Sequence, residues 1–106
     1  MSKSITEMIS NFFQALANPT RIEILELLKN KDQMCVCEIV EKLKKDQSNI
    51  SRHLNALKES GVIEFHAEGV RSNYKIKNKD VYKILELVKS ILHKDIKESQ
   101  KILAAF

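Results

Sequence analysis

The sequence predicts a mainly α-helical domain with five helices and one small β-hairpin. Apolar residues recur at three- and four-residue steps in five segments of the 106-residue chain, which is the spacing of amphipathic helices. Between the fourth and fifth segments the step changes to two, as in a strand that is buried on one face. The chain is 43% hydrophobic and 30% charged, with one Pro and two Gly, and its length suits a single core. We therefore expect one domain over residues 1–106.

The first two helices are predicted in the N-terminal third of the chain. The first has one apolar face, which consists of Ile5, Met8, Ile9, Phe12 and Leu16. The second begins at Asn18 and Pro19, because Asn is a good helix cap and Pro at the first helical position loses no hydrogen bond. Its inward face ends at Leu28, and the polar segment 29–33 follows.

The third and fourth helices are predicted to form a helix-turn-helix. A short third helix is indicated by the i, i+3, i+4, i+7 spacing of Val36, Ile39, Val40 and Leu43. Asp46 suits the cap of a fourth helix, and Gly61 suits the left-handed residue at its end. Two short helices separated by a tight polar turn are the pattern of a DNA-binding helix-turn-helix.

A β-hairpin is predicted over residues 63–77, because apolar and polar residues alternate near both of its ends. Its loop is expected over residues 67–73. There Gly69 and Asn73 tolerate unusual backbone angles, and Arg71 lies at an exposed tip. A basic hairpin directly after a helix-turn-helix corresponds to the wing of a winged helix-turn-helix.

A long fifth helix is predicted from Asp80 to about Leu103, with apolar positions at helical spacing throughout. Roughly 24 residues at 1.5 Å per residue span about 36 Å, which is longer than a small domain can cover. We therefore expect part of this helix to pack on another subunit.

The outer face of the fourth helix carries groups that read DNA. Amides pair with adenine, guanidinium groups with guanine, and hydroxyl groups with bases or phosphates, while an α-helix fits the major groove. The candidate contacts on this helix are Gln47, Ser48, Asn49, Ser51, Arg52 and His53. For His53 we expect a phosphate contact or a solvated side chain. On the wing, Arg71 and Lys75 would touch the DNA backbone or the minor groove. Any surface helix is polar, but the order of short helix, polar helix and basic hairpin favours double-stranded DNA as the partner.

Three segments of the chain resemble the ArsR/SmtB family of metal-responsive winged helix-turn-helix repressors. They are Ala15 to Leu25, Gln47 to Leu57 and Lys58 to Ile63, within a similarity over about residues 12–77. The resemblance implies a transcriptional repressor that forms a homodimer through its first and last helices, with one recognition helix in each subunit. Two such helices would meet operator half-sites about one DNA turn, roughly 34 Å, apart.

The only cysteines, Cys35 and Cys37, form a Cys-x-Cys pair at the start of the third helix. A disulfide across one intervening residue would close a very short ring, so we expect free thiols. The segment Met34 to Glu38 resembles the metal box of the same family, which implies that the two thiolates bind a thiophilic inducer that releases DNA. Side chains at i and i+2 of a regular helix point to different faces, so one ion would reach both sulfurs only after distortion of the first turn.

The residues leave the identity of the inducer open. Arsenite, copper(I), cadmium and zinc are candidates; arsenite prefers three sulfurs, whereas copper(I) accepts two, and Val40 stands where relatives often place a third Cys. A second zinc site of some relatives keeps Asp80 and His93 here but has Tyr82 and Ile96 at the other two positions, so we interpret it as lost. The alternatives for the cysteine pair are a redox- or persulfide-sensing repressor, a small thiol metal carrier or oxidoreductase, and two structural cysteines.

Charge and composition restrict the remaining classes of function. Eighteen basic and fourteen acidic residues give a net charge of +4, which permits nucleic-acid binding without requiring it. No apolar run is long enough to cross a bilayer, and the N-terminus lacks the apolar stretch of a signal peptide, so we expect a cytoplasmic protein without a membrane partner. The sequence has no phosphate-binding Gly loop, paired apolar carboxylates or activated nucleophile, and we expect no enzymatic activity.

Overall fold

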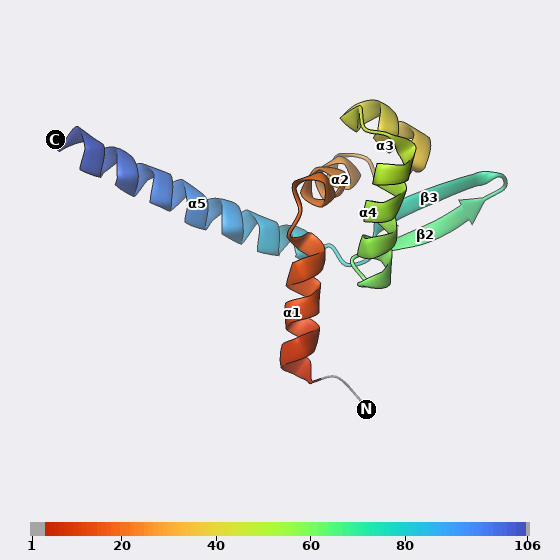
Figure 1. Cartoon of the computed structure of the whole chain (residues 1–106), viewed down its shortest axis with the longest axis horizontal. Coiled ribbons are helices and arrows are strands. Elements are labelled where there is room, and N and C mark those ends of the chain that lie inside the picture. The colour runs from red at the N-terminus through yellow and green to blue at the C-terminus, as the bar shows by residue number, and fades with distance from the viewer. Residues whose placement is uncertain (1–3, 106) are drawn as a thin grey trace.

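The computed structural model describes residues 4–105, which form five helices and three strands (Figure 1). In chain order these are α1 (Ile5–Leu16), α2 (Pro19–Asn30), β1 (Met34–Cys35), α3 (Val36–Leu43), α4 (Gln47–Glu59), β2 (Ile63–Glu68), β3 (Arg71–Ile76) and α5 (Asp80–Ala104). The fold is the expected five-helix arrangement with a hairpin. The predicted domain also includes residues 1–3 and 106, which lie outside the described residues.

The core lies where α2, α3 and α4 meet the sheet. Its fully buried side chains are apolar and come from all of these elements; they include Ile24, Leu25, Leu28, Ile39, Ile50, Leu54, Leu57 and Ile63. The helix starts are capped as the sequence predicts. Asn18 Oδ1 accepts hydrogen bonds from the amides of Thr20 (2.9 Å) and Arg21 (3.2 Å), and Asp46 Oδ1 accepts one from Asn49 (2.7 Å).

In the helix-turn-helix, a residue with a left-handed backbone conformation follows the end of each helix. Lys44, which ends α3, has φ 55°, and Gly61, which follows α4, has φ 77°. The sequence predicts the second of these, because Gly adopts this conformation without steric cost, but a left-handed lysine has no such signal.

The hairpin belongs to a three-stranded antiparallel sheet with the order β1-β3-β2. Strand β1 was not predicted, because a two-residue strand is too short to produce an alternating pattern. The expected loop over residues 67–73 is also wrong: Glu68 pairs with Arg71, so only Gly69 and Val70 form the turn. Gly69 has φ 60°, as predicted, whereas Asn73 is a buried residue inside β3.

Helix α5 extends away from the other elements (Figure 1). Its first turn is fixed to the core, because Tyr82 Oη donates to the carbonyl of Leu25 at 2.9 Å, and burial together with Glu26 raises the pKa of Tyr82 to about 12. No side chain caps the start of α5, and the amide of Asp80, its first residue, donates to Asn78 Oδ1. The radius of gyration is 16.8 Å, whereas a compact domain of this length has about 13 Å. No helix within residues 4–105 is long and apolar enough to cross a membrane.

Candidate functional site

The outer face of α4 presents most of the predicted DNA contacts. Gln47, Ser48 and Arg52 are exposed, and Ser51 and Asn49 are half-buried. The hydroxyl of Ser48 donates to the capping carboxylate of Asp46 at 3.0 Å, so its position is fixed at the helix N-terminus. The negatively charged carboxylate of Asp46 already occupies this helix N-terminus, because it accepts from the amide of Asn49. The DNA contacts of these residues remain predictions.

His53 does not belong to that face. It is only 8% exposed, and its Nδ1 accepts a hydrogen bond from Arg21 Nε at 3.1 Å. Arg21 also donates to the carbonyl of Ala15 at 3.3 Å, so this pair connects α4 to α2 and to the end of α1. Burial, followed by the positive charges of Arg21, Arg52 and Lys45, lowers the pKa of His53. The expectation of a solvated imidazole was wrong, and His53 is a neutral structural residue.

The stability of the fold should therefore fall as the pH falls through and below 6.5, the ordinary pKa of histidine. In the unfolded chain His53 takes up a proton near that pH, whereas in the folded chain its lowered pKa keeps it neutral and able to accept from Arg21. Urea unfolding at pH 7.5, 6.5 and 5.5 measures this effect. The variant His53→Gln should show a smaller loss over the same range, and an equal loss would contradict the assignment.

The two candidate DNA contacts on the wing, Lys75 and Arg71, differ in where their side chains lie. Lys75 is half-buried on β3, with its Nζ 3.6 Å from Glu64 Oε1 on the neighbouring strand β2. Arg71 is not at the tip, which Gly69 and Val70 form; it is the first residue of β3, and its side chain extends back to α3. The sequence could not indicate this direction, because the partner of Arg71 lies 33 residues earlier in the chain.

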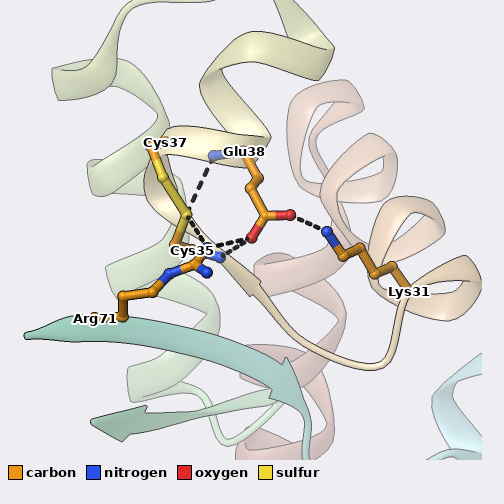
Figure 2. A network of polar contacts seen from close by, with 5 residues as sticks. All are labelled: Lys31, Cys35, Cys37, Glu38 and Arg71. Atoms are coloured by element: carbon orange, nitrogen blue, oxygen red, sulfur yellow. Dashed lines mark hydrogen bonds and ion pairs between the residues drawn. A yellow bond between two sulfur atoms is a disulfide. The ribbon is translucent and has the colours of Figure 1, made fainter. Parts of the chain in front are cut away.

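The cysteine pair lies at the junction of β1 and α3: Cys35 is the last residue of β1, and Cys37 lies in the first turn of α3 (Figure 2). Cys35 and Cys37 are joined by a disulfide, with their Cα atoms 5.4 Å apart, so the expectation of free thiols differs from this structure. The premise that both cysteines lie inside a regular helix was wrong. Cys35 precedes the helix as its cap and has an extended backbone, φ −83° and ψ 165°, so its sulfur turns toward that of Cys37. Cys35 is buried, whereas Cys37 is exposed.

A polar network surrounds Cys35 (Figure 2). The amide of Glu38 donates to Cys35 Sγ (3.4 Å), and the amide of Cys35 donates to Glu38 Oε1 (3.3 Å), which is a capping box with sulfur in place of a hydroxyl. Arg71 Nη2 donates to Cys35 Sγ (3.3 Å) and to Glu38 Oε1 (2.9 Å). Lys31 forms an ion pair with the other oxygen of Glu38. Hydrogen bonds from Lys31 and Cys35, with the charge of Arg71, lower the pKa of Glu38.

Sequence reasoning considered Glu38 only as a possible third ligand of the ion; it missed Lys31 and the capping role of Glu38. The spacing Cys35-x-x-Glu38 could have indicated a capping box, but cysteine is not among the residues that usually cap helices.

The donor set of this site is limited to two sulfurs. Within residues 4–105 no group of three or more His, Cys, Asp or Glu side chains is placed to hold a metal ion. Val40, at the position of a possible third thiol, packs against the core, and the Glu38 carboxylate is already paired with two cations. The pair therefore fits an ion that accepts two thiolates, or an ion that takes its other ligands from elsewhere.

A helix with a polar outer face, preceded by a short helix and followed by a β-hairpin, defines a winged helix-turn-helix DNA-binding protein. Residues 18–64 match a family model described as bacterial regulatory protein, arsR family. An uncharacterised HTH-type transcriptional regulator of Methanocaldococcus jannaschii is 43% identical over 82 residues, which cover 77% of this chain and 92% of that protein. The chain belongs to the ArsR family.

Two further comparisons extend this assignment. The cadmium resistance transcriptional regulatory protein CadC of Listeria innocua is 35% identical over 82 residues, which cover 77% of this chain and 69% of CadC. The solution structure of a homodimeric winged helix-turn-helix DNA-binding domain of Mycobacterium bovis, a possible ArsR-family regulator, has a TM-score of 0.79 and 29% identity, and the match covers 89% of this chain and 86% of that one. The chain is thus a DNA-binding transcriptional regulator and not an enzyme.

Proposed function

We propose that this chain is a homodimeric, cytoplasmic repressor whose affinity for its DNA operator is controlled through Cys35 and Cys37. The observation that carries the proposal is that the sulfurs of Cys35 and Cys37 lie close enough at the N-terminus of α3 to be joined by a disulfide. Helix α3 packs against α4, so a chemical change at the sulfurs acts on the support of the recognition helix. Coupling between an effector site and a DNA site is typically about 1–3 kcal/mol, which corresponds to roughly 5- to 150-fold in affinity.

The proposed dimer is supported by apolar side chains that are exposed on α1 and α5. On α1 they are Ile5, Met8, Ile9 and Phe13, and on α5 they are Leu87, Val88, Ile91, Leu92, Ile96, Ile102 and Leu103. Exposed apolar surface of this extent on two adjoining helices is typical of a protein interface. The similar M. bovis domain is a homodimer, which supports the same assembly here.

A thiophilic ion is the inducer we favour. The similar CadC protein bears the name of a cadmium resistance regulator, and the donor set here consists of two sulfurs. Copper(I) fits two thiolates, whereas cadmium, arsenite or zinc would need ligands from a small thiol or from the partner subunit. Cys35 and Cys37 in their reduced form would hold the ion.

Oxidation is the second candidate, and the disulfide between Cys35 and Cys37 favours it. In this reaction the two thiols lose two protons and two electrons as the sulfur–sulfur bond forms. An oxidant such as hydrogen peroxide takes up those protons and electrons and becomes two molecules of water.

The variant Cys35→Ser should bind the operator like the wild type and lose the response to the inducer. A serine oxygen can still cap α3, whereas one remaining sulfur can neither chelate an ion nor close a disulfide. Fluorescence anisotropy on the promoter of its own gene measures this, under reducing conditions, with and without copper(I), cadmium or arsenite, and then with peroxide. Cys37→Ser should behave in the same way. An unchanged response in both variants would contradict the assignment of the switch.

A further inference from the structure

Arg71 connects the wing to the cysteine pair. Its guanidinium group lies within hydrogen-bond distance of Cys35 Sγ and Glu38 Oε1, although it belongs to the first position of β3 (Figure 2). The main chain makes a second connection, because Cys35 pairs with Asn73 in the sheet. The cysteine pair, which is the proposed effector site, is therefore in contact with the wing as well as with α3.

The outer part of the wing has little else to hold it. Every residue from Phe65 to Ser72 is exposed, whereas Asn73, Tyr74 and Ile76 are buried at the inner end. Phe65, at the inner end of this segment, contacts the Tyr74 ring (5.4 Å between centroids) and Lys58 of α4 (5.8 Å to the ring centroid). Nearer the turn, Arg71 connects the segment to α3 through Cys35 and Glu38. A segment with few packed contacts opens readily, so the orientation of the wing depends on these hydrogen bonds.

We propose that Arg71 is a positioning residue that, with Glu38, transmits the state of the cysteine pair to the wing. In the disulfide form Arg71 donates to Cys35 Sγ and to Glu38 Oε1. Free thiolates would accept the same hydrogen bond more strongly, because they are charged, and so would hold the wing in its DNA-binding orientation. When the sulfurs bind a thiophilic cation, Cys35 gives one lone pair and much of its negative charge to the ion, which makes it a weaker acceptor, and the guanidinium group faces a second positive charge. The wing is released and DNA affinity falls. This inference rests on the proposed function, and it assigns Arg71 a role other than the direct DNA contact expected from the sequence.

The test compares Arg71→Gln, Glu38→Gln and the double variant with the wild type. The first readout is the ratio of operator dissociation constants with and without the ion that releases the wild type. Each single variant should reduce this ratio by about threefold or more, and the double variant should lower it no further than either, because both changes break the same contact. Lys31→Met is the matched control, since it removes a cation from Glu38 but leaves the contact with Arg71, and its ratio should stay that of the wild type.

The second readout is amide hydrogen exchange in residues 63–76 of the reduced protein without an ion or DNA. Exchange in this segment should be faster in Arg71→Gln and Glu38→Gln than in the wild type and in Lys31→Met. Unchanged exchange in both variants would overturn the inference. So would an Arg71→Gln protein that binds DNA more weakly by the same factor with and without the ion and loses about one unit of salt dependence for each half-site, about two for a dimer, because that is the behaviour of a phosphate contact. In that case the proposed function stands; it fails if the wild type responds to neither ion nor oxidant, or if Cys35→Ser and Cys37→Ser both keep the response.

Discussion

The variant Ile91→Glu is expected to separate the two subunits and to weaken operator binding by about 100-fold or more. Ile91 lies near the middle of α5, and 59% of it is exposed in the single chain, as are the apolar side chains one turn earlier, Leu87 and Val88. A carboxylate buried at an interface without a partner costs on the order of 3–5 kcal/mol, and a homodimer buries two copies. A separated subunit would also contact one operator half-site in place of two.

Ser90→Glu is the matched control for this change. It introduces the same charge one residue earlier, about 100° around the helix from Ile91, where the sequence is polar. Sedimentation equilibrium should find a dimer for Ser90→Glu and a monomer for Ile91→Glu, and anisotropy should find operator binding only in the control. A dimeric Ile91→Glu protein with full DNA affinity would show that α5 does not form the interface.

The variant Arg52→Ala is expected to weaken specific DNA binding by about 1–3 kcal/mol for each half-site, and so by about 2–6 kcal/mol for a dimer. Arg52 is exposed on the outer face of α4, the face that a recognition helix turns toward the major groove. A bidentate contact of arginine with guanine has this magnitude, and its loss removes discrimination at one base pair in each half-site.

Anisotropy with the operator, with base-substituted operators and with unrelated DNA measures both effects. Lys58→Ala serves as the control, because Lys58 lies in the last turn of the same helix, 5.8 Å from the centre of the Phe65 ring. The control should keep the preference for the operator. If Arg52→Ala lowered binding equally on all sequences, Arg52 would be a phosphate contact and would not read a base.

The helices could be predicted from the sequence because their signals are local. The caps at Asn18 and Asp46 and the left-handed residue at Gly61 lie within a few positions of the helix ends that they define. The apolar spacing of α5 extends over 25 residues, so its length and its exposed apolar face were both expected. Periodicity of this kind needs no knowledge of the partner surface.

The candidate site was predicted only in part. Cys35 and Cys37 were identified by spacing, but their geometry was assumed to be that of residues inside a helix. Because Cys35 ends β1, its backbone is extended, and that strand exists only through pairing with β3. The environment of His53 was predicted wrongly for a related reason. An imidazole on a polar helix suggests solvent exposure. That His53 accepts a hydrogen bond from Arg21 depends on how α2 packs against α4.

The sequence by itself determined the helices, the hairpin and the type of residue on the face of α4, because caps, periodicity and turns act over a few residues. Only the tertiary structure decided which side chains meet across the chain. Arg71 approaches Cys35 and Glu38 because the sheet brings β3 beside β1, across 36 and 33 residues of sequence. Contacts of this kind depend on the global packing of all elements, and no local pattern of residues encodes them.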